Sequence, residues 1–242
     1  DLYITDWTVE AQILENGDLS ISEDISFEFN KKYNGVYRDI YLNKTSGVSD
    51  IKVQEIKDGR PEPYMAVEKA KNGSKGVYTT EESKEKIHLK IYSPSENETK
   101  TFRISYTVKN VAIKYSDIAE LYYSFIGKQN ETAIGRLLIN LYLPAATDDA
   151  RVKLFAHGPI NGRIEKIDNR HYQLRVQELP ANNYVKGRIL VPVELIARSG
   201  NIQEGNRYQS ILDEEAAYQN ELARESARNE AFRNFFKIVN PI

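Results

Sequence analysis

The sequence of 242 residues contains no cysteine. This absence excludes disulfide bridges, thiolate nucleophiles and cysteine-ligated zinc sites. The sequence also has no apolar run that approaches the ~20 residues of a membrane-spanning helix. Its formal net charge is −2, whereas proteins that bind nucleic acid are usually basic. We therefore expect no nucleic acid among its partners.

Recognisable catalytic motifs are also missing. His88, His157 and His171 do not have the spacing of metal ligands, and neither HExxH nor GxSxG occurs. We expect no catalytic residue, no metal and no cofactor, and thus a protein that is not an enzyme. The chain begins at Asp1 without a signal peptide, so we interpret it as a processed or shortened, soluble chain.

Hydrophobic alternation with a period of two is the main pattern that the sequence does contain. Between residues 19 and 29 apolar side chains fall on odd positions, with polar ones between them, which predicts a strand with one buried face. Residues 7–13 alternate in the same way. Asn16-Gly17 separates these two runs and predicts a β-hairpin with a type I′ turn. Similar alternation recurs at 87–91, 102–108, 137–143, 172–176 and 189–193.

Many short alternating runs punctuated by Gly, Pro and Asn predict a mainly β fold, an antiparallel β-sandwich-like domain. We place this domain at residues 1–199. If it is divided into two lobes, the seam falls near 145–150. The segment DIAELYYSFIG (117–127) fits a helix with Asp117 as its cap, and it fits a buried strand equally well. Both interpretations stay open.

The C-terminal part of the sequence has a different character. Residues 206–239 contain neither Gly nor Pro and are rich in Ala, Glu, Gln and Arg, which favour helix. We predict a long α-helix over 202–240. An approximate stripe along it could pack on the β domain or leave the helix as a free stalk, and it consists of Leu212, Ala216, Ala223, Ala227 and Ala231.

The stretch NGVYRDIYLN (34–43) places two charged residues inside an apolar run. By alternation, Arg38 falls on the same face as the apolar residues, whereas Tyr37 and Asp39 fall on the other face. An unpaired buried charge is very costly, so Arg38 needs carboxylate or carbonyl partners. Its rigid fork of donors suits a clamp between strands. We favour this structural role, with an anion or carboxylate site at Arg38 as the alternative.

Several stretches occur in a characteristic order: ILENGDLSISEDISFEFN, YNGVYRDIYLN, AELYYSFIG, LYLP, LFAHGPINGRI and RILVPVEL. From about residue 3 to 195 the sequence resembles the extracellular region of the YciQ-like predicted membrane proteins, the domain of unknown function 2207. Tyr123 stands where this family usually has tryptophan. The resemblance implies a domain on the extracellular face of the cell membrane, in a protein that is anchored by spanning segments. It carries over no catalytic residue.

Tyrosine is over-represented, with 16 copies against 8 phenylalanines. A tyrosine combines an apolar ring with a polar hydroxyl, which suits amphipathic sheet faces and also contact with proteins or glycans. Our candidate structural or interaction residues are Tyr37, Arg38, Asp39, Tyr122 and Tyr123. We expect a non-enzymatic extracellular module that binds a protein or envelope component. The alternatives are a carbohydrate-binding or glycan-processing module and a structural spacer built on the helix.

Overall fold

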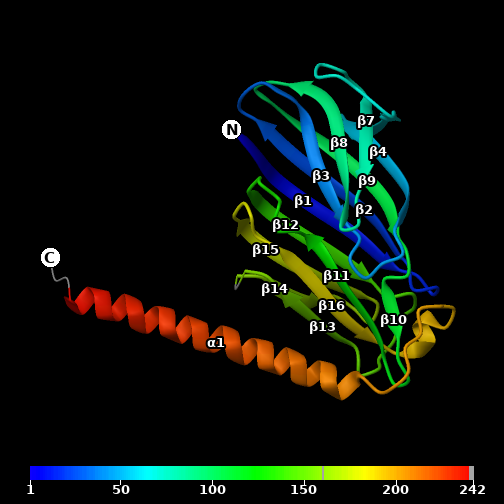
Figure 1. Ribbon diagram of the computed structural model, residues 1–242, viewed down its shortest axis with the longest axis vertical. Helices are drawn as coiled ribbons and strands as arrows, with labels where there is room; N and C mark the ends of the chain where they lie inside the picture. The colour runs from blue at the N-terminus through cyan, green and yellow to red at the C-terminus, as the bar shows by residue number, and fades with distance from the viewer. Residues whose placement is uncertain (160, 240–242) are drawn as a thin grey trace.

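The computed structural model describes residues 1–159 and 161–239, with side chains up to residue 230. Within these residues the chain is mainly β and ends in one long helix (Figure 1), as the sequence predicts. The largest sheet has the strand order β14-β15-β12-β1-β2-β9-β4-β5. Its strands are β14 (Arg163–Lys166), β15 (His171–Leu179), β12 (Ile134–Tyr142), β1 (Leu2–Ile13), β2 (Leu19–Phe29), β9 (Glu98–Val108), β4 (Val48–Lys57) and β5 (Arg60–Pro63).

Two four-stranded sheets pack against the large sheet, in the orders β3-β8-β7-β6 and β10-β11-β16-β13. The first contains β3 (Tyr33–Tyr41), β8 (Lys86–Ser95), β7 (Val77–Glu82) and β6 (Met65–Ala66). The second contains β10 (Ala112–Lys114), β11 (Ala119–Ile126), β16 (Val185–Val191) and β13 (Lys153–His157). Figure 1 shows the two small sheets side by side over different halves of the large one. One continuous apolar core includes Ile25, Leu89 and Ile189, one residue from each sheet.

Most strand pairs are antiparallel, as predicted from the alternation, but β1 and β12 run parallel with Trp7 opposite Leu137. The segment 145–150, predicted as a seam if there are two lobes, is the connection that carries the chain from β12 in the large sheet to β13 in a small sheet. β12 and β13 belong to different sheets, so the chain between them has to pass from one layer to the other. The core continues across both small sheets.

The predicted hairpin joins β1 and β2, but its turn is not type I′. Gly17 has a φ of 84° while Asn16 keeps a negative φ, and type I′ needs positive φ at both central residues. The side chain of Asn16 instead accepts a hydrogen bond from the amide of Asp18 (3.1 Å). The Asp18 carboxylate in turn accepts one from the amide of Asn110 (2.8 Å). The turn is therefore shaped by side-chain contacts with the loop after β9.

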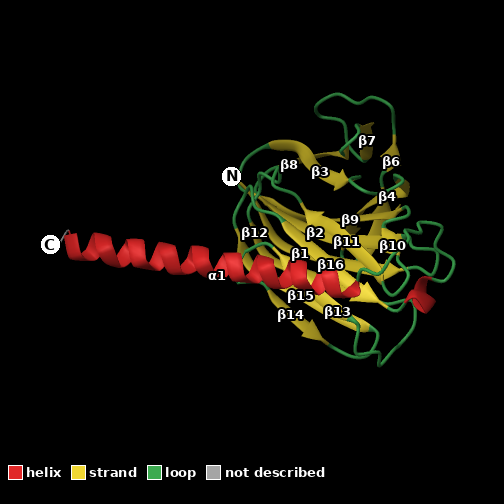
Figure 2. Cartoon of the chain, turned by 60° about the horizontal axis from the view of Figure 1, so that its bottom comes forward, coloured by secondary structure: helices red, strands yellow, loops and turns green. Residues whose placement is uncertain are grey.

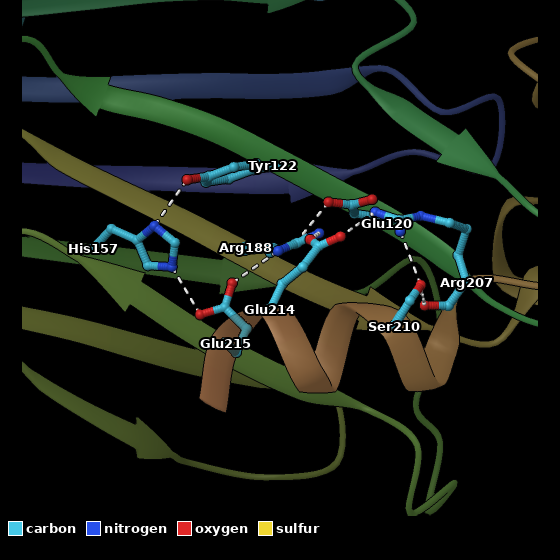
Figure 3. A network of polar contacts seen from close by, with 8 residues as sticks. All are labelled: Glu120, Tyr122, His157, Arg188, Arg207, Ser210, Glu214 and Glu215. Carbon is cyan, nitrogen blue, oxygen red and sulfur yellow. Dashed lines mark hydrogen bonds and ion pairs between the residues drawn. The ribbon is translucent and has the colours of Figure 1, made fainter. Parts of the chain in front are cut away.

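The ambiguous segment 117–127 forms strand β11, and both of its faces are covered. Leu121 and Tyr123 belong to the central core, whereas Glu120 and Tyr122 face the C-terminal helix (Figure 3). Asp117 does cap a helix, but a distant one. Its carboxylate accepts hydrogen bonds from the amides of Arg207 (2.8 Å) and Tyr208 (3.1 Å), at the start of α1.

Helix α1 spans Tyr208–Val239 and follows a short 3₁₀ helix, η1 (Val193–Ile196). It begins six residues later than the predicted start at residue 202, because Ile202 forms a β-bridge with Lys114. Residue 240, the predicted end, lies outside the described residues. Figure 1 and Figure 2 both show α1 starting against the second small sheet and then leaving the β domain.

The docked face of α1 includes Leu212 of the predicted stripe, but none of the stripe's alanines whose side chains the structure describes. Ile211 is fully buried with Tyr115, Ile118 and Leu190, and Glu215 is also buried. Residues Ala216, Ala223 and Ala227 are exposed, and the side chain of Ala231 lies outside the described residues. Ile211 packs in an apolar cluster and Glu215 bonds to Arg188. These larger side chains determine which face of the helix docks, because an alanine methyl group makes fewer contacts. From residue 223 to 230 every side chain is exposed, so the helix is both docked and projecting.

Candidate functional site

Arg38 lies where β3 and β11 approach each other above the large sheet. Its side chain is only 6% exposed, so it faces the interior as the alternation predicted. Nε donates to Oε1 of Glu23 (2.7 Å), and Nη2 donates to Oε2 of the same carboxylate (3.1 Å). Nη2 also donates to the carbonyl oxygen of Phe125 (3.0 Å). One guanidinium on β3 therefore contacts β2 of the large sheet and β11 of the other small sheet.

Aromatic side chains complete the surroundings of this ion pair. The indole Nε1 of Trp7 donates to Glu23 (3.0 Å), and the Arg38 guanidinium lies 4.7 Å from the centre of the Trp7 rings. The hydroxyl of Tyr106 donates to Glu23 (3.3 Å). Burial alone would lower the pKa of Arg38, but the charge of Glu23 outweighs it and raises that pKa. Arg38 is thus held as a cation, and its hydrogen-bond acceptors include the carboxylate of Glu23 and the carbonyl of Phe125.

Sequence reasoning missed Glu23, although the sequence contains a signal for it. Glu23 occupies an odd position of β2, between Ile21 and Ile25, on the face that the alternation assigns to the core. It is 0% exposed. A carboxylate on an apolar face needs a partner for the same reason as the Arg38 guanidinium does. The two exceptions to the alternation could have been matched to each other.

A cleft of about 850 Å³ opens beside this seam. Its large-sheet side carries Leu2, Ile4 and Phe27, and one wall is β3 from Tyr33 to Tyr41. The opposite wall is the loop from β11 to β12, residues 127–132. At the rim, Tyr37 is 58% exposed, and its ring stacks on His88 at 5.0 Å between centroids.

The charged groups at this rim are paired with one another. Asp39 accepts a hydrogen bond from Lys86 (2.6 Å) and contacts Nδ1 of His88 (2.6 Å). Lys86 also donates to Gln129 (2.5 Å) on the opposite wall, so it bridges the cleft. Burial alone would raise the pKa of Asp39, but the hydrogen bonds from Lys86 and His88 lower it. Asp39 is therefore a carboxylate at neutral pH, neutralised by its neighbours.

A second polar network fixes α1 to the β domain (Figure 3). Arg188 of β16 is 5% exposed, and it donates to Glu120 of β11 (2.7 Å) and to Glu215 of α1 (2.9 Å). It also donates to Glu214 (2.8 Å). His157 of β13 joins this network, because its Nε2 lies 2.8 Å from Glu215. Two strands therefore hold the start of the helix at Glu214 and Glu215, and Glu120 on a third strand keeps Arg188 in place.

The structure divides the five candidate residues between these places. Tyr37 and Asp39 line the cleft, and Arg38 reaches from its lining into the core. Tyr123 is buried at the seam, where its hydroxyl donates to the carbonyl of Tyr41 (3.5 Å). Tyr122 faces the other side of β11, and its hydroxyl lies 2.8 Å from Nδ1 of His157 in the helix network.

A close approach at Gly127 shapes the end of the seam. A Cβ placed on Gly127 would lie 1.9 Å from the hydroxyl oxygen of Tyr41 and 2.0 Å from its ring carbon Cζ. Only glycine leaves room for the Tyr41 ring there. The loop that forms the far wall of the cleft thus begins at a position where β3 and β11 touch.

In the part of the chain that the structure describes, no group of three His, Asp or Glu side chains is placed to hold a metal ion. Nor does any helix there combine the length and apolarity needed to cross a membrane. Fold and site together define a mainly β domain with an internal ionic clamp, a ligand-sized cleft and a docked helix.

Residues 3–191 match the model of one family, the N-terminal domain of a predicted membrane protein (DUF2207). The chain belongs to this family, which confirms the resemblance seen in its sequence motifs. The family is one of predicted membrane proteins and has no known function. No curated protein matches the chain.

Several solved structures are similar to this chain at low sequence identity. Native yeast LTA4 hydrolase is 12% identical with a TM-score of 0.48, covering 78% of this chain and 29% of the hydrolase. An M1 zinc metallopeptidase from Deinococcus radiodurans is 10% identical with a TM-score of 0.40, covering 77% of this chain and 42% of the peptidase. A putative protease from Parabacteroides distasonis is 8% identical with a TM-score of 0.45, covering 79% and 40%. The chain thus spans less than half of each of these proteins.

Proposed function

We propose that this domain is a non-enzymatic binding module on the outer face of the cell membrane, and that the cleft beside β3 is its ligand site. One observation carries the proposal: a cleft of about 850 Å³ with a lining of polar and apolar residues has an exposed tyrosine at its rim. Ligand sites are typically clefts of roughly 300–1,000 Å³, and the volume of this cleft falls within that range.

The pairing of the charged groups supports a binding role over a catalytic one. A general acid or base must be able to exchange a proton with a ligand. Asp39 is occupied by Lys86 and His88, and Arg38 is occupied by Glu23. These groups stabilise the walls of the cleft. A ligand would meet a nearly neutral surface that is already formed.

The carbohydrate-binding alternative has less support from the same cleft. Such a module would need two or three exposed aromatic rings along a groove to stack on sugars. Of the tyrosines on β3, Tyr37 is exposed, whereas Tyr33 and Tyr41 are partly buried. We therefore favour a protein segment or another envelope component as the ligand.

Binding can be tested by screening the domain against phage-displayed random 12-residue peptides and against an array of glycans. We expect retained ligands whose affinity falls at least tenfold in Tyr37→Ala. The control is Met65→Ala, which removes a side chain of similar exposure (65%) on β6, at the far edge of the same small sheet. A screen without ligands, or ligands that bind Tyr37→Ala as well as the native domain, would contradict the proposal.

The side of the membrane can be tested independently, because this chain has no cysteine. Lys69 lies on an exposed stretch between β6 and β7, so Lys69→Cys introduces a single accessible thiol into the domain. In the membrane-anchored protein on intact cells, with any cysteine outside this domain replaced by serine, a membrane-impermeant maleimide should label this variant and not the cysteine-free parent. Labelling that appears only after lysis would place the domain inside.

A further inference from the structure

We propose that the ligand of the cleft is an extended polypeptide segment that adds to the free edge of β3 as a further strand. This inference rests on the proposed function, since it assumes that the cleft binds a ligand. β3 is the terminal strand of its sheet, and it pairs with β8 on one side only. Its other side faces the cleft and β11.

The main-chain groups that face the cleft follow from the ladder. The amide of Leu42 donates to the carbonyl of Glu85 (2.8 Å), so Leu42 and, by alternation, the other even-numbered residues of β3 bond to the β8 side. The N–H and C=O groups of the odd-numbered residues then point away from β8. Two contacts agree with this: the carbonyl of Asp39 accepts from the Arg38 guanidinium, and that of Tyr41 accepts from Tyr123.

The seam with β11 covers this edge at Asp39 and Tyr41, and the cleft begins beyond it. The main chain of Tyr37 and of Gly35 therefore offers donors and acceptors where the cleft is open. From Gly35 to Tyr37 the open part of this edge is about 7 Å long at ~3.4 Å per residue. Edge strands usually carry a charge, a proline or a bulge against further pairing. β3 has a register irregularity between Tyr33 and Gly35, and the outward side chain after it, at Tyr37, is uncharged.

The side chains around the edge indicate which segment would fit. An added strand would point alternate side chains toward Leu2, Ile4 and Phe27 on the large sheet and the others toward solvent beside Tyr37. In strand addition, main-chain hydrogen bonds provide affinity and pockets for alternate side chains provide specificity.

Asp39 is paired with Lys86 and His88 beside this edge. The far wall carries one cation and one anion, Lys128 and Glu131. The complementary segment is therefore neutral overall, with apolar residues at every second position.

The main-chain contribution can be tested with a capped nine-residue peptide of alternating Val and Thr and two N-methylated forms of it. One form is methylated at the odd positions and the other at the even positions. The valines fix which side chains face the large sheet, so only one form loses the N–H groups that point to β3. We expect that form to bind at least tenfold more weakly and the other form to bind like the parent peptide.

Variants of the domain provide a second test. Tyr37→Pro removes a main-chain N–H that points into the cleft and leaves the ladder with β8 intact, a position where proline is tolerated. Relative to Tyr37→Ala, which controls for the side chain, it should weaken the parent peptide about tenfold at a similar melting temperature. Peptide binding should also slow hydrogen exchange of the Gly35 and Tyr37 amides in the native domain.

The outcomes separate this inference from the proposed function. Equal affinity of the two methylated peptides, or glycans as the only ligands from the screen, would overturn strand addition and leave the cleft as a binding site. A dimer of the chain alone that Tyr37→Pro dissociates in sedimentation would also overturn it, because a second copy would then occupy the edge. The absence of any ligand in the peptide and glycan screens contradicts the proposed function itself.

Discussion

Removing the charge of Arg38 should destabilise the whole β domain. In Arg38→Met, Glu23 would remain buried without its ionic partner, and the carbonyl of Phe125 would lose a donor. Breaking a buried ion pair in this way typically costs about 3–5 kcal/mol. For a domain of this size about 1 kcal/mol lowers the melting temperature by ~2–4 °C. We therefore expect a loss of roughly 6–20 °C.

The assay can use the protein's own reporter. Trp7 is the only tryptophan in the sequence, it is 3% exposed, and it touches both members of the ion pair. Urea unfolding followed by tryptophan fluorescence thus reports on the clamp directly. Arg103→Met is the matched control, because Arg103 makes a two-pronged pair with Asp24 at side chains that are 39% and 36% exposed. Such a surface pair is worth only ~0–1 kcal/mol.

A double variant tests whether the cost comes from the unpaired carboxylate. In Arg38→Met with Glu23→Gln, the neutral amide oxygen can still accept from Trp7, so about 1–3 kcal/mol of the single-variant loss should be regained. If Arg38→Met unfolds within ~1 kcal/mol of the native domain, like Arg103→Met, the clamp is refuted. An altered ligand affinity in that stable variant would then support the alternative of an anion site at Arg38.

Three further predictions concern the helix and the seam. Burial alone would raise the pKa of Glu215, but hydrogen bonds from His157 and Arg188 lower it below its ordinary 4.5. The helix docking that Glu215 supports is therefore full above pH ~5 and lost as the pH falls through the lowered value. Amide exchange in the first turns of α1 should show this loss, and Glu215→Gln should weaken its pH dependence, leaving the part that Glu214 contributes through Arg188 and Arg207. Asp117→Ala removes the cap of α1 and should cost ~1 kcal/mol, seen as faster exchange of the Tyr208 amide. Gly127→Ala should lower stability by about 1–3 kcal/mol through its clash with Tyr41, and a melting temperature equal to that of the native domain would contradict the packing of this seam.

Local patterns in the sequence predict the parts of this fold that depend on neighbouring residues. Alternation identifies the strands, and it places Arg38 on the buried face of β3 because a strand reverses its side chains at every step. It fails for β11, where both faces are covered and the period of two is hidden by apolar and aromatic residues on both sides. The same pattern held enough information to find Glu23, as an exception on the inner face of β2.

Long-range contacts explain what the sequence could not predict. Arg188 lies on the outer face of β16, and it is buried only because α1 returns to cover it. The docked face of α1 contains Ile211 and Glu215, which are complementary to this surface and do not form a conspicuous stripe. The cleft likewise arises between β3 and a loop about ninety residues later, and no local pattern encodes that distance.

The half-docked state of α1 has a consequence for its mechanics. Residues 223–239 form about half of the helix, and a separate helix of roughly 12–15 residues is marginal in water because nucleation is unfavourable. The turns held by Arg188 supply a preformed nucleus on which the projecting half can propagate. Breaking these contacts would remove the nucleus and loosen the projecting half, so the ionic network at the base of α1 sets how rigidly the projecting turns are held relative to the β domain.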